Sequence, residues 1–198
     1  MPDLTGHRVE SWRVELLTAD DAPVGELVGA LGGEVEQNVH AVISGGGTLR
    51  LRDVGQDIDW LRARLQLWWT VGDQEWPLGV FLPSAPVARH DATGRAWDVE
   101  LLDKLVVLDQ DKLDGSYSLA AGTVVTSAVQ EIIASAGETR TAITASAETL
   151  TAGMVWEAGT TKLRVVNDLL AVINYFALRC DGYGRYVVAP YQAPRNRT

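Results

Sequence analysis

The residue types that carry most enzyme chemistry are few in this sequence and far apart. The three histidines, His7, His40 and His90, fall in different predicted turns. A zinc site needs closely spaced His and Cys ligands, and the sequence has no His-x-x-x-His or Cys-x-x-Cys pair. The one cysteine, Cys180, excludes an internal disulfide and is compatible with a reducing cytoplasm. We therefore predict no metal site and no cofactor.

Two further patterns resemble chemical sites without matching them. Ser44 does not lie in the Gly-x-Ser-x-Gly turn that positions a serine nucleophile. The run Asp109–Gly115 resembles a calcium loop, but its third acid comes one place late and no glutamate follows at the required offset. Pairs of carboxylates could serve a glycosidase, yet 26 acidic residues make coincidental pairs the expected outcome. The sequence thus predicts no catalytic residues and a protein that is not an enzyme.

The charge balance is acidic. There are 17 Lys and Arg against 26 Asp and Glu, which gives a net charge of −9. Tight binding to nucleic-acid phosphates needs clustered positive charge, so we do not predict it. Hydrophobic residues make up 46% and charged residues 22% of the chain, as in ordinary globular proteins. No run has the length of a membrane span or the pattern of a signal peptide.

Tryptophan is the other residue type that could form a site. Five of the seven fall in or beside predicted strands: Trp60, Trp68, Trp69, Trp76 and Trp97. Such residues can fill a core, stack on sugars or anchor an interface between subunits. Trp68 and Trp69 are neighbours in a strand and must point to opposite faces, so at least one lies outside the core. We favour a subunit interface over a ligand site, with Trp68, Trp69 and Trp76 as its candidates.

The elements that position these residues are mostly strands in the first half of the chain. Period-two alternation predicts strands over 9–17, 62–70, 79–82 and 97–102, with a Pro-bounded connection after the third and a tight turn at 91–94. The triplet Gly45–Gly47 lacks the Lys-Ser/Thr of a phosphate loop and is interpreted as a hairpin turn. Short strands at this spacing predict a closed or nearly closed antiparallel barrel.

The pattern changes after Gly115. Helical spacing predicts one helix over 124–136, with Thr123 as N-cap and Gly137 as C-cap, and another over 162–178. A hairpin follows with its turn at Asp181–Gly184. We therefore predict a mixed β and α+β fold: an antiparallel β-barrel-like domain over 1–115, followed by a smaller α+β domain over 116–198 that ends in a linker-like tail.

Several short motifs now occur in a recognisable order. They are E-W-x-L-G-V-F from Glu75, W-x-V-x-x-x-D-K-L from Trp97, L-D-Q-D-K-L from Leu108, and a tyrosine before Gly122-Thr-x-Val. Together they resemble the hub protein at the tail tip of tailed bacteriophages, which is often described as a minor tail protein in long-tailed phages. The pattern is similar in plan to the baseplate hub of contractile phages and covers most of the chain.

The resemblance implies a structural virion protein. Such a protein forms a ring-shaped hub that joins the tail tube to the distal tip or fibre proteins and surrounds the DNA-ejection channel, with DNA passing transiently and without specific binding. It would be a homo-oligomer, with a trimer favoured over a hexamer, assembled in the host cytoplasm and located in the phage tail. In the family the α+β part continues into a second barrel, so this chain is expected to correspond to the N-terminal portion.

An acidic lumen would repel DNA at short range, because physiological salt screens charges beyond roughly 8 Å. The acids expected to face that lumen are Asp53, Asp57, Asp59, Asp109 and Asp111. The alternative function is a carbohydrate-binding module, or the non-catalytic part of a cell-wall-targeting tail protein, with exposed tryptophans as stacking platforms.

Overall fold

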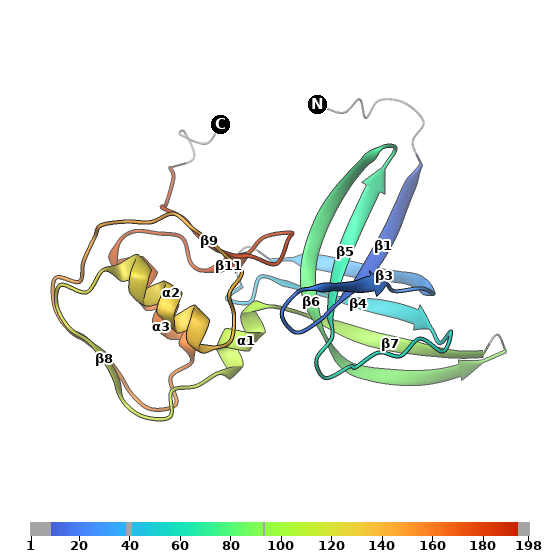
Figure 1. Cartoon of the computed structure of the whole chain (residues 1–198), viewed down its shortest axis with the longest axis horizontal. Coiled ribbons are helices and arrows are strands. Elements are labelled where there is room, and N and C mark those ends of the chain that lie inside the picture. The colour runs from blue at the N-terminus through green and yellow to red at the C-terminus, as the bar shows by residue number, and fades with distance from the viewer. Residues whose placement is uncertain (1–8, 39–40, 93, 194–198) are drawn as a thin grey trace. The chain divides into compact units, whose positions relative to one another are not determined.

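The computed structural model describes residues 9–38, 41–92 and 94–193, and these form two compact units (Figure 1). The first unit extends to Lys104 and includes the turn Asp181–Gly184. The second begins at Leu105 and contains the rest of the chain. The change of sequence pattern at Gly115 therefore comes later than the boundary set by contacts. The helix that begins at Leu105 packs within the second unit. The boundary between the units therefore lies after Lys104, before the change of pattern at Gly115.

The first unit is one antiparallel sheet of seven strands in the order β2-β1-β5-β6-β7-β4-β3. Its strands are β1 (Glu10–Leu17), β2 (Pro23–Glu26), β3 (Ala30–Gln37), β4 (Gly45–Arg52), β5 (Arg64–Val71), β6 (Gln74–Asp91) and β7 (Gly94–Asp103). The strands predicted from alternation at 9–17, 62–70 and 97–102 are confirmed as β1, β5 and β7.

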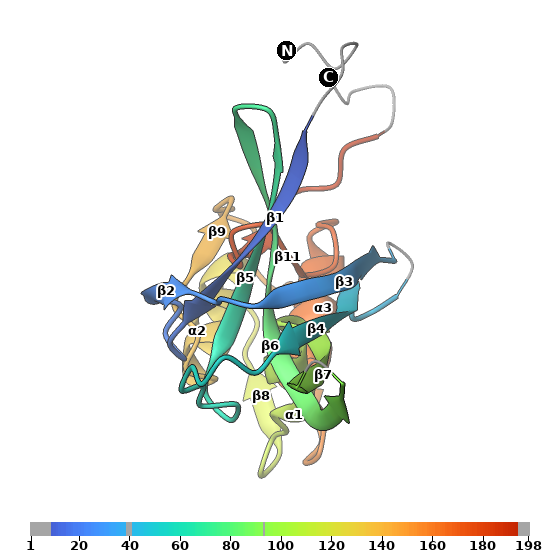
Figure 2. The same cartoon turned by 90° about the vertical axis from the view of Figure 1, so that its right-hand side faces the viewer.

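The two edge strands of this sheet are consecutive in the chain. β2 and β3 are joined by residues 27–29, and the ribbon passes almost straight from one to the other (Figure 2). The Leu27 N–H donates to the Val14 carbonyl on one side, and the Arg52 N–H donates to the Gly29 carbonyl on the other, both at 2.8 Å. The barrel-like fold class is confirmed. Among the described residues, however, β2 and β3 do not pair, so the barrel is not closed by hydrogen bonds.

The core lies on the inner face of the curved sheet. Successive side chains of a strand point to opposite faces, so alternate residues in parts of β1, β4, β5 and β7 are buried there, such as Val14 and Leu16 of β1. The core contains Val14, Leu16, Leu27, Leu49, Leu51, Ala63, Leu65, Leu67, Phe81, Val99 and Leu101. Most of these apolar residues come from strands far apart in sequence, and the alternation within each strand places them on one inner face of the sheet.

The prediction of a hairpin turn at the glycine triplet Gly45–Gly47 is wrong. Gly45–Gly47 lies inside β4, which pairs with β3 on one side and β7 on the other. A Cβ atom on Gly47 would overlap the Glu34 carbonyl oxygen, and one on Gly33 would overlap the Thr48 carbonyl oxygen. These glycines therefore permit a close approach of β3 and β4. Glycine can thus mark a close contact between strands as well as a turn.

The prediction of a Pro-bounded connection after the strand at 79–82 is also wrong. β6 runs without interruption from Gln74 to Asp91. Pro83 is paired with Leu101, and Pro86 lies in a bulge where the register of β6 on β7 shifts between Ser84 and Val87. Ala85 takes a left-handed backbone conformation there (φ 43°). Bulges tolerate proline because they interrupt the ladder of hydrogen bonds. The predicted turn is confirmed, with Asp91 paired to Gly94.

The second unit combines three helices with short strands. Its elements are α1 (Leu105–Gln110), β8 (Tyr117–Leu119), α2 (Val125–Ser135), β9 (Thr141–Ile143), β10 (Met154–Trp156), α3 (Lys162–Val172), β11 (Arg179–Cys180) and β12 (Tyr186–Val188). β8 pairs with β10, and β12 lies between β11 and β9. The hairpin predicted around residues 181–184 is confirmed as β11–β12. In the described part of the chain, no helix has the length and apolar composition needed to cross a bilayer.

Both predicted helices are present, with corrected ends. The N-cap residue of α2 is Val124, and the Thr123 hydroxyl donates instead to the Ala120 carbonyl at 2.8 Å. α3 is capped by Thr161, whose hydroxyl accepts from the Arg164 N–H at 3.2 Å. It ends at Val172 instead of residue 178, and Asn174 then takes a left-handed conformation (φ 54°), as is common after a helix.

Candidate functional site

The structure places Trp68 on the outer face of the barrel-like sheet. Its Nε1–H donates to the Glu15 carboxylate at 3.3 Å, and the Arg13 guanidinium lies over its ring at 5.0 Å. The Tyr183 ring meets it edge-on at 6.0 Å. Arg13 also forms an ion pair with Glu75 at 3.0 Å. Trp68 is therefore half-buried in a polar and aromatic surface cluster, outside the core.

Trp69 and Trp76 lie on the opposite face and contact each other. They are paired across β5 and β6, with ring centroids 5.5 Å apart. Trp12 of β1 is paired with Trp69 from the other side, so three adjacent strands carry a row of three tryptophans, here called the tryptophan row. Cross-strand aromatic pairs stabilise a sheet, by roughly 0.2–1 kcal/mol each. Trp12 is nevertheless 59% exposed, which leaves an aromatic surface for a partner.

Sequence analysis did not single out Trp12. A signal was present, because alternation in β1 places Trp12 on the same face as Val14 and Leu16. That face is buried at Leu16 and Val14 and becomes exposed at Trp12, near the start of β1. The start of β1 lies beside the hairpin that joins β5 to β6 (Figure 1). Trp60 and Trp97, by contrast, pack together at 5.7 Å against the core. The five tryptophans chosen from the sequence thus divide between core and surface.

Three of the five acids expected to face a lumen lie in the first unit. The Asp53 carboxylate accepts from the Gly55 N–H at 3.0 Å and lies 3.6 Å from the Arg95 guanidinium. Asp57 and Asp59 are exposed and line a hollow of about 410 Å³ together with Asp20. Asp53 is thus partly neutralised, whereas the other two carboxylates face solvent.

The remaining two acids, Asp109 and Asp111, lie in the second unit, at the end of α1 and just after it. Asp111 forms an ion pair with Lys162 at 2.7 Å. The five candidates are therefore not gathered into one group within either unit. Over residues 9–38, 41–92 and 94–193, no three His, Cys, Asp or Glu side chains converge in a way that could hold a metal ion.

A buried ionic cluster was not foreseen. The Lys104 side chain is inaccessible to solvent, and its Nζ donates to the Asp21 carboxylate at 2.6 Å and to the Gly184 carbonyl at 3.0 Å. Arg64 contacts the other oxygen of Asp21 at 2.8 Å. Buried charges need such partners, because desolvation of an unpaired charge is very unfavourable. The cluster, here called the Asp21 cluster, holds the turn 181–184 in the first unit and has a structural role.

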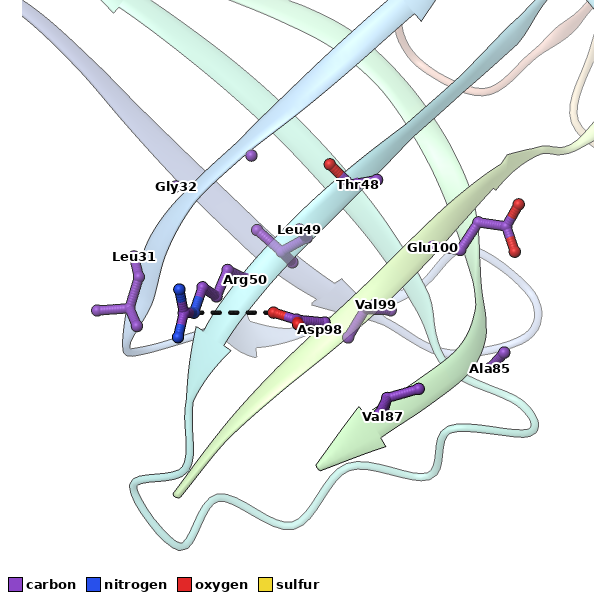
Figure 3. Close-up of a pocket in the computed structure, with 11 residues that line it drawn as sticks. Leu31, Gly32, Thr48, Leu49, Arg50, Ala85, Val87, Asp98, Val99 and Glu100 are labelled. Carbon is purple, nitrogen blue, oxygen red and sulfur yellow. Dashed lines mark ion pairs between the residues drawn. The ribbon is translucent and has the colours of Figure 1, made fainter. Parts of the chain in front are cut away.

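The outer face of β3, β4, β6 and β7 carries a hollow of about 550 Å³ (Figure 3). Arg50 and Asp98 point toward each other in its centre and form an ion pair at 3.7 Å. The exposed side chains Leu31 and Val87 lie on either side of that pair. The hollow thus combines an ionic centre with apolar sides, and it has no neighbouring nucleophile and base that would suggest catalysis.

A smaller pocket of about 210 Å³ lies in the second unit between α2, α3 and Tyr117. Burial raises the pKa of the Tyr117 hydroxyl, and the negative charge of Glu131 raises that pKa further. The Lys162 Nζ, which also lines the pocket, donates to the Ser135 carbonyl at 3.1 Å. A phenol whose pKa is raised stays protonated at neutral pH, so this group is not an activated base.

Comparison with known proteins gives a likeness in fold. No protein-family model matches the chain, and no curated protein matches it in sequence. Solved structures of tail proteins, one of them from a prophage, do share its fold. The resemblance to tail-tip and baseplate hub proteins is therefore confirmed at the level of fold.

Three of these structures illustrate the likeness. A tail protein from Neisseria meningitidis superposes with a TM-score of 0.62 at 10% identity, covering 93% of this chain and 52% of that one. A 43 kDa tail protein of prophage MuSo2 from Shewanella oneidensis gives 0.59 at 14% identity, covering 94% and 57%. A Francisella PdpA-VgrG complex gives 0.54 at 9% identity, covering 98% and 30%. The chain spans about half the length of the two tail proteins.

Proposed function

We propose that the chain is a structural part of a phage tail, and that it forms a ring-shaped hub between the tail tube and the distal tip or fibre proteins. In this proposal the hub is a homo-oligomer, with a trimer favoured over a hexamer, and it surrounds the channel through which DNA leaves. It acts by assembly and not by catalysis. The protein assembles in the host cytoplasm and functions in the virion.

The observation that carries this proposal is the fold, which is similar to that of solved tail proteins over more than nine-tenths of the chain. The site chemistry supports it in a second way. The surface of the first unit carries a row of tryptophans with Trp12 exposed, and aromatic residues are enriched in interfaces. A ring places such surfaces between copies, where they are covered.

Native mass spectrometry and electron microscopy of the purified chain test the proposal. We expect a defined oligomer, three copies in the favoured case, seen as rings with a central opening. A chain that stays monomeric at all accessible concentrations would contradict it. Mixing with the tail-tube protein from the same phage should give a larger complex, which identifies the neighbour on one side.

Two groups of residues have proposed places in such a ring. Trp68, Trp69 and Trp76 would lie at a subunit interface, and Trp12 extends this group. The acids expected at the lumen remain Asp53, Asp57, Asp59, Asp109 and Asp111, although the ion pairs of Asp53 and Asp111 lower the repulsion that each offers to DNA. A reconstruction of the ring with these acids buried away from the opening would exclude the lumen role.

The exposure of Trp12 favours a second candidate function, the binding of bacterial cell-wall glycans. Aromatic rings bind sugars by stacking, and a row of tryptophans offers several such surfaces. A glycan array probed with the wild-type chain and with Trp12→Ala would test this. Binding that is lost in the variant supports the glycan function, whereas no binding by the wild type removes it.

A further inference from the structure

The pocket of about 210 Å³ in the second unit has apolar walls on three sides. Ile132 of α2 and Val165 of α3 line it and are 6% and 0% exposed. Leu113, which follows α1, is half-buried and also lines it. The Leu113 N–H donates to the Thr160 carbonyl at 2.9 Å, and the Gly159 N–H donates to the Leu113 carbonyl at 2.8 Å. These bonds hold the third wall beside the start of α3, so the pocket is built to receive an apolar group.

Two polar side chains of the pocket are available to a ligand. Within residues 9–38, 41–92 and 94–193, neither the Tyr117 hydroxyl nor the Glu131 carboxylate forms a hydrogen bond or an ion pair. Burial raises the pKa of the Tyr117 hydroxyl and the charge of Glu131 raises it further, so the two groups lie within electrostatic reach of each other. The hydroxyl stays protonated and can donate, whereas the carboxylate can only accept.

Lys162 supplies a third polar group, and its position is fixed. Its Nζ donates to the Ser135 carbonyl at 3.1 Å and forms an ion pair with Asp111 at 2.7 Å. An ammonium group has three N–H donors, so these two contacts leave one. One lysine and one glutamate line the pocket, and the formal charge of its lining is 1 − 1 = 0. An anion would meet Glu131 and a cation would meet Lys162, so a neutral ligand with its own donor and acceptor fits best.

The acetamido group has this combination of properties. Its carbonyl oxygen accepts two hydrogen bonds, its N–H donates one, and its methyl group is apolar. We propose that the pocket binds the acetamido group of an N-acetylated hexosamine. The amide carbonyl accepts from the Tyr117 hydroxyl and the Lys162 ammonium, and the amide N–H donates to the Glu131 carboxylate. The methyl group packs against Ile132 and Val165.

A sugar fits this pocket better than a peptide does. The volume lies below the roughly 300–1,000 Å³ of sites for drug-sized ligands, so the pocket admits one small group. An acetamido group ends in its methyl, whereas a peptide amide continues as chain on both sides. The Tyr117 ring also lines the pocket, and its contact with the Trp156 ring at 5.9 Å holds it in place. It offers an aromatic surface to the apolar face of a sugar ring.

The inference goes beyond the proposed hub and does not depend on it. All residues that line the pocket belong to the second unit, whereas the tryptophan row belongs to the first. A hub that binds no sugar and a sugar-binding chain that forms no ring are both physically consistent. The two proposals therefore succeed or fail separately.

NMR titration of the ¹⁵N-labelled full chain with N-acetylglucosamine tests the proposal. We expect shifts at amides around the pocket, and the strongest saturation transfer at the acetyl methyl group of the sugar. Glucose lacks the acetamido group and glucosamine carries a cation in its place, so neither should cause these shifts at the same concentration. N-acetylalanine methylamide, the peptide probe, should bind at least tenfold more weakly than the sugar.

Four variants identify the groups that bind. Tyr117→Phe should weaken binding roughly two- to tenfold, the range of a neutral hydrogen bond, and Glu131→Ala by roughly tenfold or more. Tyr191→Phe and Glu148→Ala are the matched controls, because both residues are exposed in the second unit and do not line the pocket. They should leave the affinity unchanged. Circular dichroism on heating verifies that every variant is folded.

Three results would overturn the inference. The first is the absence of shifts at the highest soluble concentration of N-acetylglucosamine, or equal shifts with glucose. The second is an affinity that neither Tyr117→Phe nor Glu131→Ala changes, or shifts confined to the indole N–H groups of the tryptophan row, which would place the sugar there. The third is tighter binding of the peptide probe than of the sugar. None of these results bears on the oligomeric state, which native mass spectrometry measures independently.

Discussion

Replacing Lys104 by methionine tests the Asp21 cluster most directly. Methionine has a similar volume but no charge, so the variant removes the cation from Asp21 and the donor from the Gly184 carbonyl. Breaking a buried ion pair by removing one partner destabilises a protein by about 3–5 kcal/mol. Arg64 stays 2.8 Å from the Asp21 carboxylate and keeps it partly neutralised. We therefore expect a loss near the lower end, about 3 kcal/mol.

Urea unfolding followed by tryptophan fluorescence measures this loss. Six of the seven tryptophans, all except Trp156, lie in the first unit and report on it. Arg89→Met is the control, because its ion pair with Asp98 is in the same unit but exposed, and exposed pairs contribute about 0–1 kcal/mol. An unfolding free energy of Lys104→Met within about 0.5 kcal/mol of the wild type, the range of ordinary surface substitutions, would refute the role assigned to the cluster.

Two further predictions concern single residues. Gly47→Ala should destabilise the first unit by about 1–3 kcal/mol, as overpacking does, because the new Cβ meets the Glu34 carbonyl oxygen. Gly46→Ala has more room and should cost less, and equal urea midpoints for the two variants would contradict this account. The raised pKa of Tyr117, caused by burial and then by Glu131, stabilises the fold below pH 10, and this contribution is lost as the pH rises through the folded pKa. Tyr117→Phe should therefore lose less stability than the wild type between pH 9 and pH 11, measured by thermal unfolding, and identical pH profiles would argue against it.

Much of the fold could be predicted because apolar residues that face the core recur at the spacing of the strand or helix that carries them. In β7, Trp97, Val99 and Leu101 alternate with polar residues, and the structure places them on the inner face as expected. The same reasoning failed where one residue type has two uses. Glycine serves turns and also close strand contacts, and only the partner strand decides between them, as at Gly47. Proline ends strands but also fits bulges, as in β6.

The candidate site was less predictable for a similar reason. Lys104 and Asp21 are 83 residues apart, and nothing local marks either as buried. Trp69 and Trp76 were named because they are tryptophans in strands, whereas their pairing required the register of β5 on β6. Long-range pairing, which a single sequence does not encode locally, makes these sites.

The turn 181–184 has a consequence for how the protein is made. Gly184 follows its partner Lys104 by 80 residues, and Gly182 accepts from the Gln66 amide at 2.7 Å. At a synthesis rate of about 5–20 residues per second, the ribosome needs roughly 4–16 s after Lys104 to produce Gly184. During that interval the Lys104 Nζ and the Gln66 amide lack the carbonyl acceptors of Gly184 and Gly182. The first unit therefore reaches its full set of contacts only after the turn 181–184 has been synthesised.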